Sequence, residues 1–182
     1  RQFNVENPIR IIGIDEESLK AFGQWPWPRH RLADLTQRLT QHGAAAIAFD
    51  FIFAEPAREN LAQLLTGLPN TKIRQDLERK LSFFPDADKL LAADFAKAPA
   101  VLGVALSKDG ENNFKQKSGI VTLGDNPEQF LIKFPAFIGP ITELLEPARG
   151  LGFTNWLPDH DQVVRNVPLM MSVNGSIITS LA

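Results

Sequence analysis

Three short apolar runs divide the first two-thirds of the chain, and more polar segments separate them. The runs cover residues 9–14, 44–53 and 101–106. Each has the length of a buried strand, and the segments between them repeat apolar residues at helical spacing. The order strand, helix, strand, helix, strand predicts parallel strands joined by right-handed crossovers. We therefore expect an α/β fold with a βαβαβ parallel core and flanking helices.

Capping signals support the helices of this pattern. Asp15 is a typical N-cap for a short helix that Gly23 ends. A longer helix ends at Gly43, and a further one is expected between residues 86 and 99. The longer helix carries a stripe of leucines, namely Leu32, Leu35 and Leu39.

Two regions lie outside the βαβ pattern. Residues 57–85 predict a helical insertion with two amphipathic faces. The C-terminal region predicts an antiparallel strand pair, Val163–Val173 and Ser176–Ala182, joined by a tight turn at Asn174-Gly175. We expect residues 1–182 to form a single domain. The leucines and phenylalanine of the insertion are Leu61, Leu64, Leu65, Leu68, Leu77, Leu81 and Phe84.

Composition narrows the classes of function. The chain has 182 residues, of which 44% are hydrophobic, as in a globular domain. A net charge of −2 gives no reason to expect a nucleic-acid partner. The absence of cysteine excludes disulfides, thiolate chemistry and cysteine-bound zinc, and the three histidines are scattered. No apolar run of about 18 residues is present, so no segment of this sequence is expected to span a bilayer. We expect no cofactor.

A stiff aromatic arm, residues 25–29 (WPWPR), leads into the longer helix. Trp25 and Trp27 are candidates for stacking on a ligand, whereas the structural alternative is that both rings fill the seam between a strand and a helix. Arg29 lies at a helix start, where its charge opposes the helix dipole, so it needs a specific acceptor. That acceptor is either a structural carboxylate or a bound anion.

Asp15 ends the first expected strand and Asp50 lies near the end of the second, at the edge where open α/β sheets bind ligands. Asp15 and Asp50 are therefore candidates for a ligand site or, more weakly, for Mg²⁺. The structural alternative is that Asp15 caps its helix while Asp50 pairs with Arg29 or accepts backbone N–H groups. Asp161 and Arg165 present a similar choice. Either they pair within one loop, with Asp159, or they point toward the strand-end crevice at Asp15 and Asp50.

The same residues carry a resemblance to a known family. The pattern resembles the second type of CHASE domain, the cyclase- and histidine-kinase-associated sensory extracellular domain of bacterial receptors. The likeness runs from about Val5 to Ala182. Its segments are Ile14-Asp15-Glu16 with Ser18, Trp25-Pro26-Trp27-Pro28-Arg29, Gly43-Ala44 through Ile47-Ala48-Phe49-Asp50 to Phe53, Gly152-x-x-Asn155, Pro158-Asp159-x-Asp161, and Val164-Arg165 with Pro168-Leu169.

The resemblance implies a periplasmic or extracytoplasmic sensor that transmembrane helices outside this sequence connect to a cytoplasmic cyclase or kinase. It implies an unknown small ligand or protein partner and no catalytic activity in this domain. Two features depart from the family. Gln162 replaces the usual glycine, at a cost of about 1–2 kcal/mol if the backbone is left-handed there, and the 57–85 segment is longer than usual.

Two other functions remain open at this stage. The first is a protein-interaction domain without a small ligand, in which the insertion mediates docking or homodimerisation. The second is a metal-dependent hydrolase that uses Asp15, Asp50 and Asp161. No sequence motif for a nucleophile or general base supports the hydrolase.

Overall fold

The computed structural model describes residues 8–57, 65, 69–81, 83, 86–111, 114–117 and 119–181. Its main sheet contains β1 (Ile47–Phe49), β2 (Ala100–Ser107), β4 (Ala136–Ile138) and β5 (Gly150–Phe153). β1 and β5 both pair with β2 in parallel, and β4 pairs antiparallel with the end of β2. A second sheet has the order β3 (Lys133–Phe134), β6 (Met170–Val173), β7 (Ser176–Thr179).

The helices confirm the capping signals. α1 (Glu16–Phe22) has Asp15 as its N-cap and ends at Gly23, whose φ is 88°. α2 (Arg29–Gln41) is followed by Gly43, which also has a positive φ. α5 (Ala87–Phe95) is capped by the Asp86 side chain. A short helix, α6 (Thr142–Leu145), and a 3-10 helix, Pro127–Phe130, complete the part between β2 and β5.

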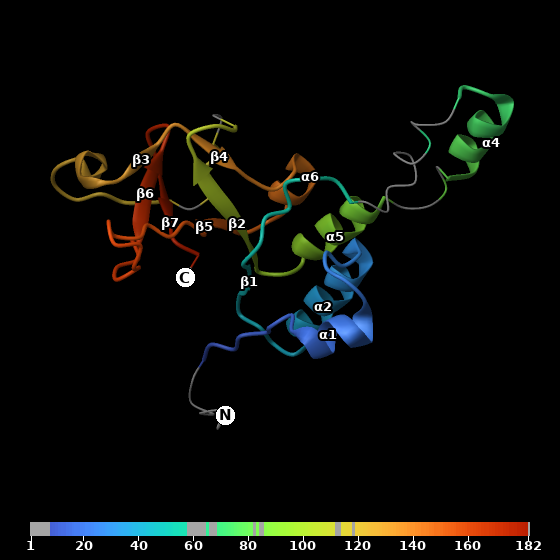
Figure 1. Ribbon diagram of the computed structural model, residues 1–182, viewed down its shortest axis with the longest axis horizontal. Helices are drawn as coiled ribbons and strands as arrows, with labels where there is room; N and C mark the ends of the chain where they lie inside the picture. Colours follow the sequence, from blue (N-terminus) through green and yellow to red (C-terminus); the bar gives the residue numbers. More distant parts are fainter. Residues whose placement is uncertain are drawn as a thin grey trace.

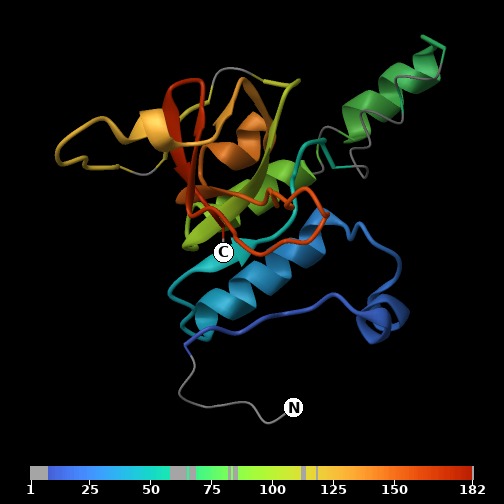
Figure 2. The ribbon, with the colours of Figure 1, turned by 60° about the vertical axis from the view of Figure 1, so that its left-hand side comes forward.

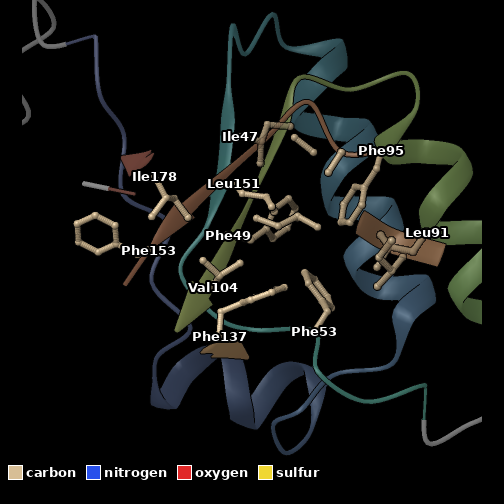
Figure 3. Packing of buried hydrophobic residues seen from close by; sticks show 14 of the residues in the cluster. Ile47, Phe49, Phe53, Leu91, Phe95, Val104, Phe137, Leu151, Phe153 and Ile178 are labelled. Atoms are coloured by element: carbon tan, nitrogen blue, oxygen red, sulfur yellow. The ribbon is translucent and has the colours of Figure 1, made fainter. Parts of the chain in front are cut away.

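α2 and α5 pack on the main sheet, and the core lies between these two helices and the sheet. Phe49 of β1, Phe53 of the following loop and Phe95 of α5 form an aromatic cluster with ring centroids 5.2–5.9 Å apart. Figure 3 shows these rings converging from their three elements, beside Leu91. The edge-on ring contacts add to the area that burial removes from water, so the end of β1 is firmly fixed.

The C-terminal strand pair is confirmed in a shorter form. β6 and β7 pair antiparallel, with Asn174 and Gly175 at φ 48° and 78° in the turn between them. Residues 163–169, expected as the first part of the strand, are irregular and mostly exposed. The chain then joins the main sheet, because Ser180 forms a parallel bridge with Phe153 and the Leu181 N–H donates to the Phe153 carbonyl at 2.9 Å.

The insertion is helical where the structure describes it. α4 (Lys72–Leu81) projects away from the body of the molecule (Figures 1 and 2) and buries none of its side chains. Leu65 is buried, while Leu61, Leu64, Leu68 and Phe84 lie outside the described residues.

The α/β class with parallel strands and helical crossovers is confirmed, but the expected strand at 9–14 is wrong for this structure. Residues 8–15, hereafter the N-terminal arm, form no strand and bury no side chain. The third parallel strand of the sheet is β5 instead, from the last third of the chain. An apolar run becomes a strand only where it pairs with the edge of a sheet, and residues 8–15 belong to neither of the two sheets.

Candidate functional site

A pocket opens where β1 ends, between the aromatic arm and the loop that follows the strand. Its volume is about 250 Å³. Hydrophobic and proline side chains form most of the wall, and one cation and one carboxylate lie among them. The lining residues are Pro26, Trp27, Arg29, Ile52, Phe53, Ala54, Glu55, Pro56 and Ala57.

A buried ion pair fixes one side of this pocket. The Arg29 Nε lies 2.7 Å from the Asp88 Oδ1, and the two side chains are only 13% and 5% exposed. The Arg29 Nη2 donates to the Glu55 carbonyl at 2.7 Å, and the Ala57 N–H donates to the Asp88 Oδ2 at 2.7 Å. α2, α5 and the loop after β1 are therefore held together by charge-assisted hydrogen bonds.

The guanidinium also lies over an aromatic ring, with its Cζ 4.8 Å from the Phe53 centroid. Its Nη1 makes no hydrogen bond with any residue that the structure describes. Arg29 lines the pocket, and a guanidinium N–H is a donor suited to a carboxylate or phosphate oxygen of a ligand. The side-chain carboxylate of Glu55 is exposed at the rim.

The two tryptophans of the aromatic arm have different surroundings. Trp27 is half-buried, lines the pocket and donates from its Nε1 to the Gly23 carbonyl at 2.8 Å. Trp25 is exposed and contacts Trp27 and Phe51 edge-on, at centroid distances of 6.1 and 4.8 Å. The core-filling alternative thus fits Trp27 in part, and Trp25 forms the outer edge of the aromatic cluster.

The structure places the two strand-end aspartates apart. Asp15 caps α1, accepting from the Ser18 N–H at 2.9 Å and the Ser18 hydroxyl at 2.7 Å. These two hydrogen bonds lower the pKa of Asp15, and the bond from the Ser18 backbone N–H has the larger effect. Asp50 is exposed directly after β1, next to the loop that lines the pocket.

The alternative in which Asp50 pairs with Arg29 is wrong. Arg29 starts α2 on the side that packs against α5, so Asp88 of α5 accepts its charge instead. The side chain of Asp50 has no hydrogen bond or ion pair within the described part of the chain.

Asp159, Asp161 and Arg165 form a separate cluster within one loop. Arg165 donates to the Asp159 Oδ2 at 2.9 Å and to both carboxylate oxygens of Asp161 at 2.9 and 2.7 Å. The hydrogen bond from Arg165 lowers the pKa of Asp161, and these carboxylates raise the pKa of Arg165. These residues do not line the pocket, and their geometry fits the intra-loop pairing.

No group of three or more histidine, cysteine or acidic residues suited to a metal ion occurs in the described ranges. None of the helices described there is long and apolar enough to cross a membrane. The ligand-binding role of the seven candidates stays a prediction, and the structure brings only Trp27 and Arg29 of them into the pocket wall.

Sequence reasoning missed Asp88 and Glu55 as residues of this site. Asp88 lies in the first turn of α5, two residues after the N-cap Asp86. The helix dipole alone explains an aspartate in the first turn of a helix, so the sequence gives no signal that Asp88 has a buried partner. Glu55 contributes its backbone carbonyl to Arg29, a role that no side-chain pattern reveals.

The family model of the CHASE2 domain matches residues 1–182. The searches of curated proteins and of solved structures found no match.

Proposed function

The chain belongs to the CHASE2 family of sensory extracellular domains, and from this premise we propose that its pocket is the ligand site of a bacterial transmembrane receptor. The domain would lie in the periplasm, attached to transmembrane helices in the inner membrane. Those helices would connect it to a cytoplasmic cyclase or kinase. The observation that carries the proposal is the pocket of about 250 Å³ at the carboxyl end of β1, the edge at which parallel sheets bind ligands.

The pocket walls indicate the chemistry of the ligand. Trp27 and the flanking prolines provide an apolar surface for a small organic molecule, and the Arg29 Nη1 provides a donor for an acidic oxygen. Polar and apolar atoms share the pocket surface almost equally, so polar groups would fix the orientation of a small ligand against the apolar walls.

Binding transmits a signal only if the ligand favours one conformation of the domain over another. A tenfold difference in affinity between two conformations supplies about 1.4 kcal/mol. The loop of residues 50–57 connects the pocket directly to β1, so a change in this loop reaches the sheet without an intervening element.

Native mass spectrometry of the freshly purified domain, compared with its denatured mass, tests the proposal. We expect an additional mass that is lost on denaturation. Ala54→Phe fills the pocket from its exposed rim and should abolish the additional mass, whereas Ala93→Phe, on the exposed face of α5, should retain it.

A thermal-shift screen against small organic acids and amino acids covers a ligand that is lost in purification. A ligand at about one hundred times its Kd stabilises the domain by about 2.7 kcal/mol. The proposal is wrong if no compound stabilises the natural chain more than Ala54→Phe. Asp50→Asn should abolish ligand-dependent stabilisation while the domain still folds, which tests whether the ligand reaches the strand end beside the pocket.

The alternative function is a protein-interaction or homodimerisation domain without a small ligand. One observation favours it, namely that α4 projects from the body with Ile73 exposed and no buried side chain. A dimer without additional mass in the same spectrum would support this alternative over a ligand.

A further inference from the structure

β1 is an edge strand whose outer side has no partner within the described ranges, where β2 alone pairs with it. The Ile47 N–H donates to the Pro99 carbonyl at 3.0 Å, toward β2. Because alternate residues of a parallel strand direct their backbone groups to opposite sides, the N–H and C=O of Ala48 point outward. An open edge of this kind is a template for one more strand.

The N-terminal arm carries a segment that fits this edge. Ile11 is 93% exposed and Ile12 is 54% exposed, although the run at 9–14 has the composition and length of a buried strand. Figures 1 and 2 both show the arm, in dark blue, outside the packed body of the molecule. Exposure of several isoleucines in one extended segment leaves apolar area in water that docking would bury.

The handedness of the crossover connections indicates which side of β1 the N-terminal arm would occupy. The connection from β1 through α5 to β2 is a parallel crossover, and α2 packs beside α5, as the Gln37–Asp94 and Arg29–Asp88 contacts show. Suppose that the N-terminal arm were a strand connected to β1 through α2 by a right-handed crossover. The helix α2 would then lie on the same face of the sheet as α5 only if the N-terminal arm lay on the outer side of β1.

We propose that residues 9–14 dock on the outer edge of β1 as an additional parallel strand, and that the arrangement in this structure is the undocked form of the arm. Docking pairs the outward N–H and C=O of Ala48 and covers part of the half-buried Leu35 and Leu39 of α2. It also brings Asp15 to the same end of the sheet as Asp50. Since α1 and the aromatic arm follow directly, docking moves the residues that lead into the pocket.

Hydrogen exchange at single residues tests the proposal on the 182-residue chain. In the docked form, hydrogen exchange at the Ala48 amide is slowed by at least about tenfold. Ile11→Pro should remove that protection, because proline has no N–H to donate and disrupts the strand. Val121→Pro, at another exposed β-branched residue outside any element, should leave Ala48 unchanged. An Ala48 amide that exchanges as fast as an unprotected one in the natural chain overturns the proposal.

A disulfide test is independent of the stability of the proline variant, because the chain contains no cysteine. Side chains alternate across a strand, so Ala48→Cys should crosslink with only one of Ile11→Cys and Ile12→Cys, and within one chain. Equal crosslinking of both pairs, or of neither, contradicts strand docking. Crosslinked dimers would mean that the arm docks on a second copy of the chain.

Discussion

At the scale of single residues, Arg29 has the largest structural role in the site. It contacts a carboxylate of α5, a carbonyl of the loop after β1 and the ring of Phe53. A lysine at this position lacks the planar guanidinium that reaches both the Asp88 carboxylate and the Glu55 carbonyl. Because both members of the ion pair are buried, removal of either one leaves an uncompensated charge.

Asp88→Ala should therefore lower the free energy of unfolding by about 3–5 kcal/mol, measured by urea denaturation. Asp34→Ala is the matched control, since Asp34 pairs with Arg38 on α2 but is 61% exposed. We expect this variant to lose about 0–1 kcal/mol. Similar losses in the two variants would show that the Asp88 pair contributes no more than a surface pair.

Gln162 gives a second prediction at this scale. Its φ is 65°, so the position where the family usually has glycine keeps the left-handed backbone here. A side chain costs about 1–2 kcal/mol in this region, and glycine in turn loses more entropy on folding.

Gln162→Gly should raise the free energy of unfolding by about 0.5–1 kcal/mol, also in urea. Gln24→Gly, at an exposed bend with an ordinary φ, should lower it by a similar amount. Equal effects of the two substitutions would mean that the left-handed backbone of Gln162 is not strained.

At the scale of elements, Asn155 ends β5 and holds it to its neighbour. The side-chain Oδ1 accepts from the Leu106 N–H at 2.6 Å, and the Nδ2 donates to the Leu106 carbonyl at 2.8 Å. An amide side chain thus continues the pairing with β2 after the last backbone hydrogen bond, from the Thr154 N–H to the Val104 carbonyl at 2.9 Å. The segment beyond it is then able to leave the sheet.

Asn155→Ala should lower the free energy of unfolding by about 1–3 kcal/mol, because two backbone groups of Leu106 lose their partners. Hydrogen exchange at the Leu106 amide should accelerate in this variant. Asn126→Ala removes an exposed cap of the 3-10 helix and should leave Leu106 unaffected. Unchanged exchange at Leu106 would contradict the role of Asn155.

The elements that could be predicted from sequence are those that local chemistry specifies. Asp15 with Gly23 fixed the bounds of α1, and Asn174-Gly175 fixed the turn of the last strand pair. β5 is different, because its short run of residues 150–153 becomes a strand only by pairing with β2, about fifty residues earlier. The 9–14 run shows the converse, since its apolar pattern predicts a strand and the structure assigns none to residues 8–15.

The site was predictable to the same degree. Trp27 and Arg29 carry chemistry that a sequence displays, and both line the pocket. The identity of the carboxylate beside Arg29 depends on how α2 packs against α5. The sequence offered Asp50 as one alternative, and the packing of the two helices gives Arg29 to Asp88 instead.

At the scale of the whole molecule, the C-terminal end is tied into the same sheet as the pocket. A Cβ on Gly152 would lie 2.6 Å from the Leu181 Cα, so the glycine is what permits the last residues to pack on β5. β5, β2 and β1 are successive parallel neighbours. The end of the described chain and the pocket loop are therefore connected through three hydrogen-bonded strands.

The placement of the aromatic arm also determines how the domain absorbs and emits ultraviolet light. The chain has no tyrosine, so its emission comes from three indoles, and two of them, Trp25 and Trp27, belong to the arm beside the pocket. The third, Trp156, is exposed in the segment after β5. Replacing Trp156 with phenylalanine would leave a protein whose tryptophan fluorescence originates entirely at the aromatic arm beside the pocket, an optical probe already present in the natural chain.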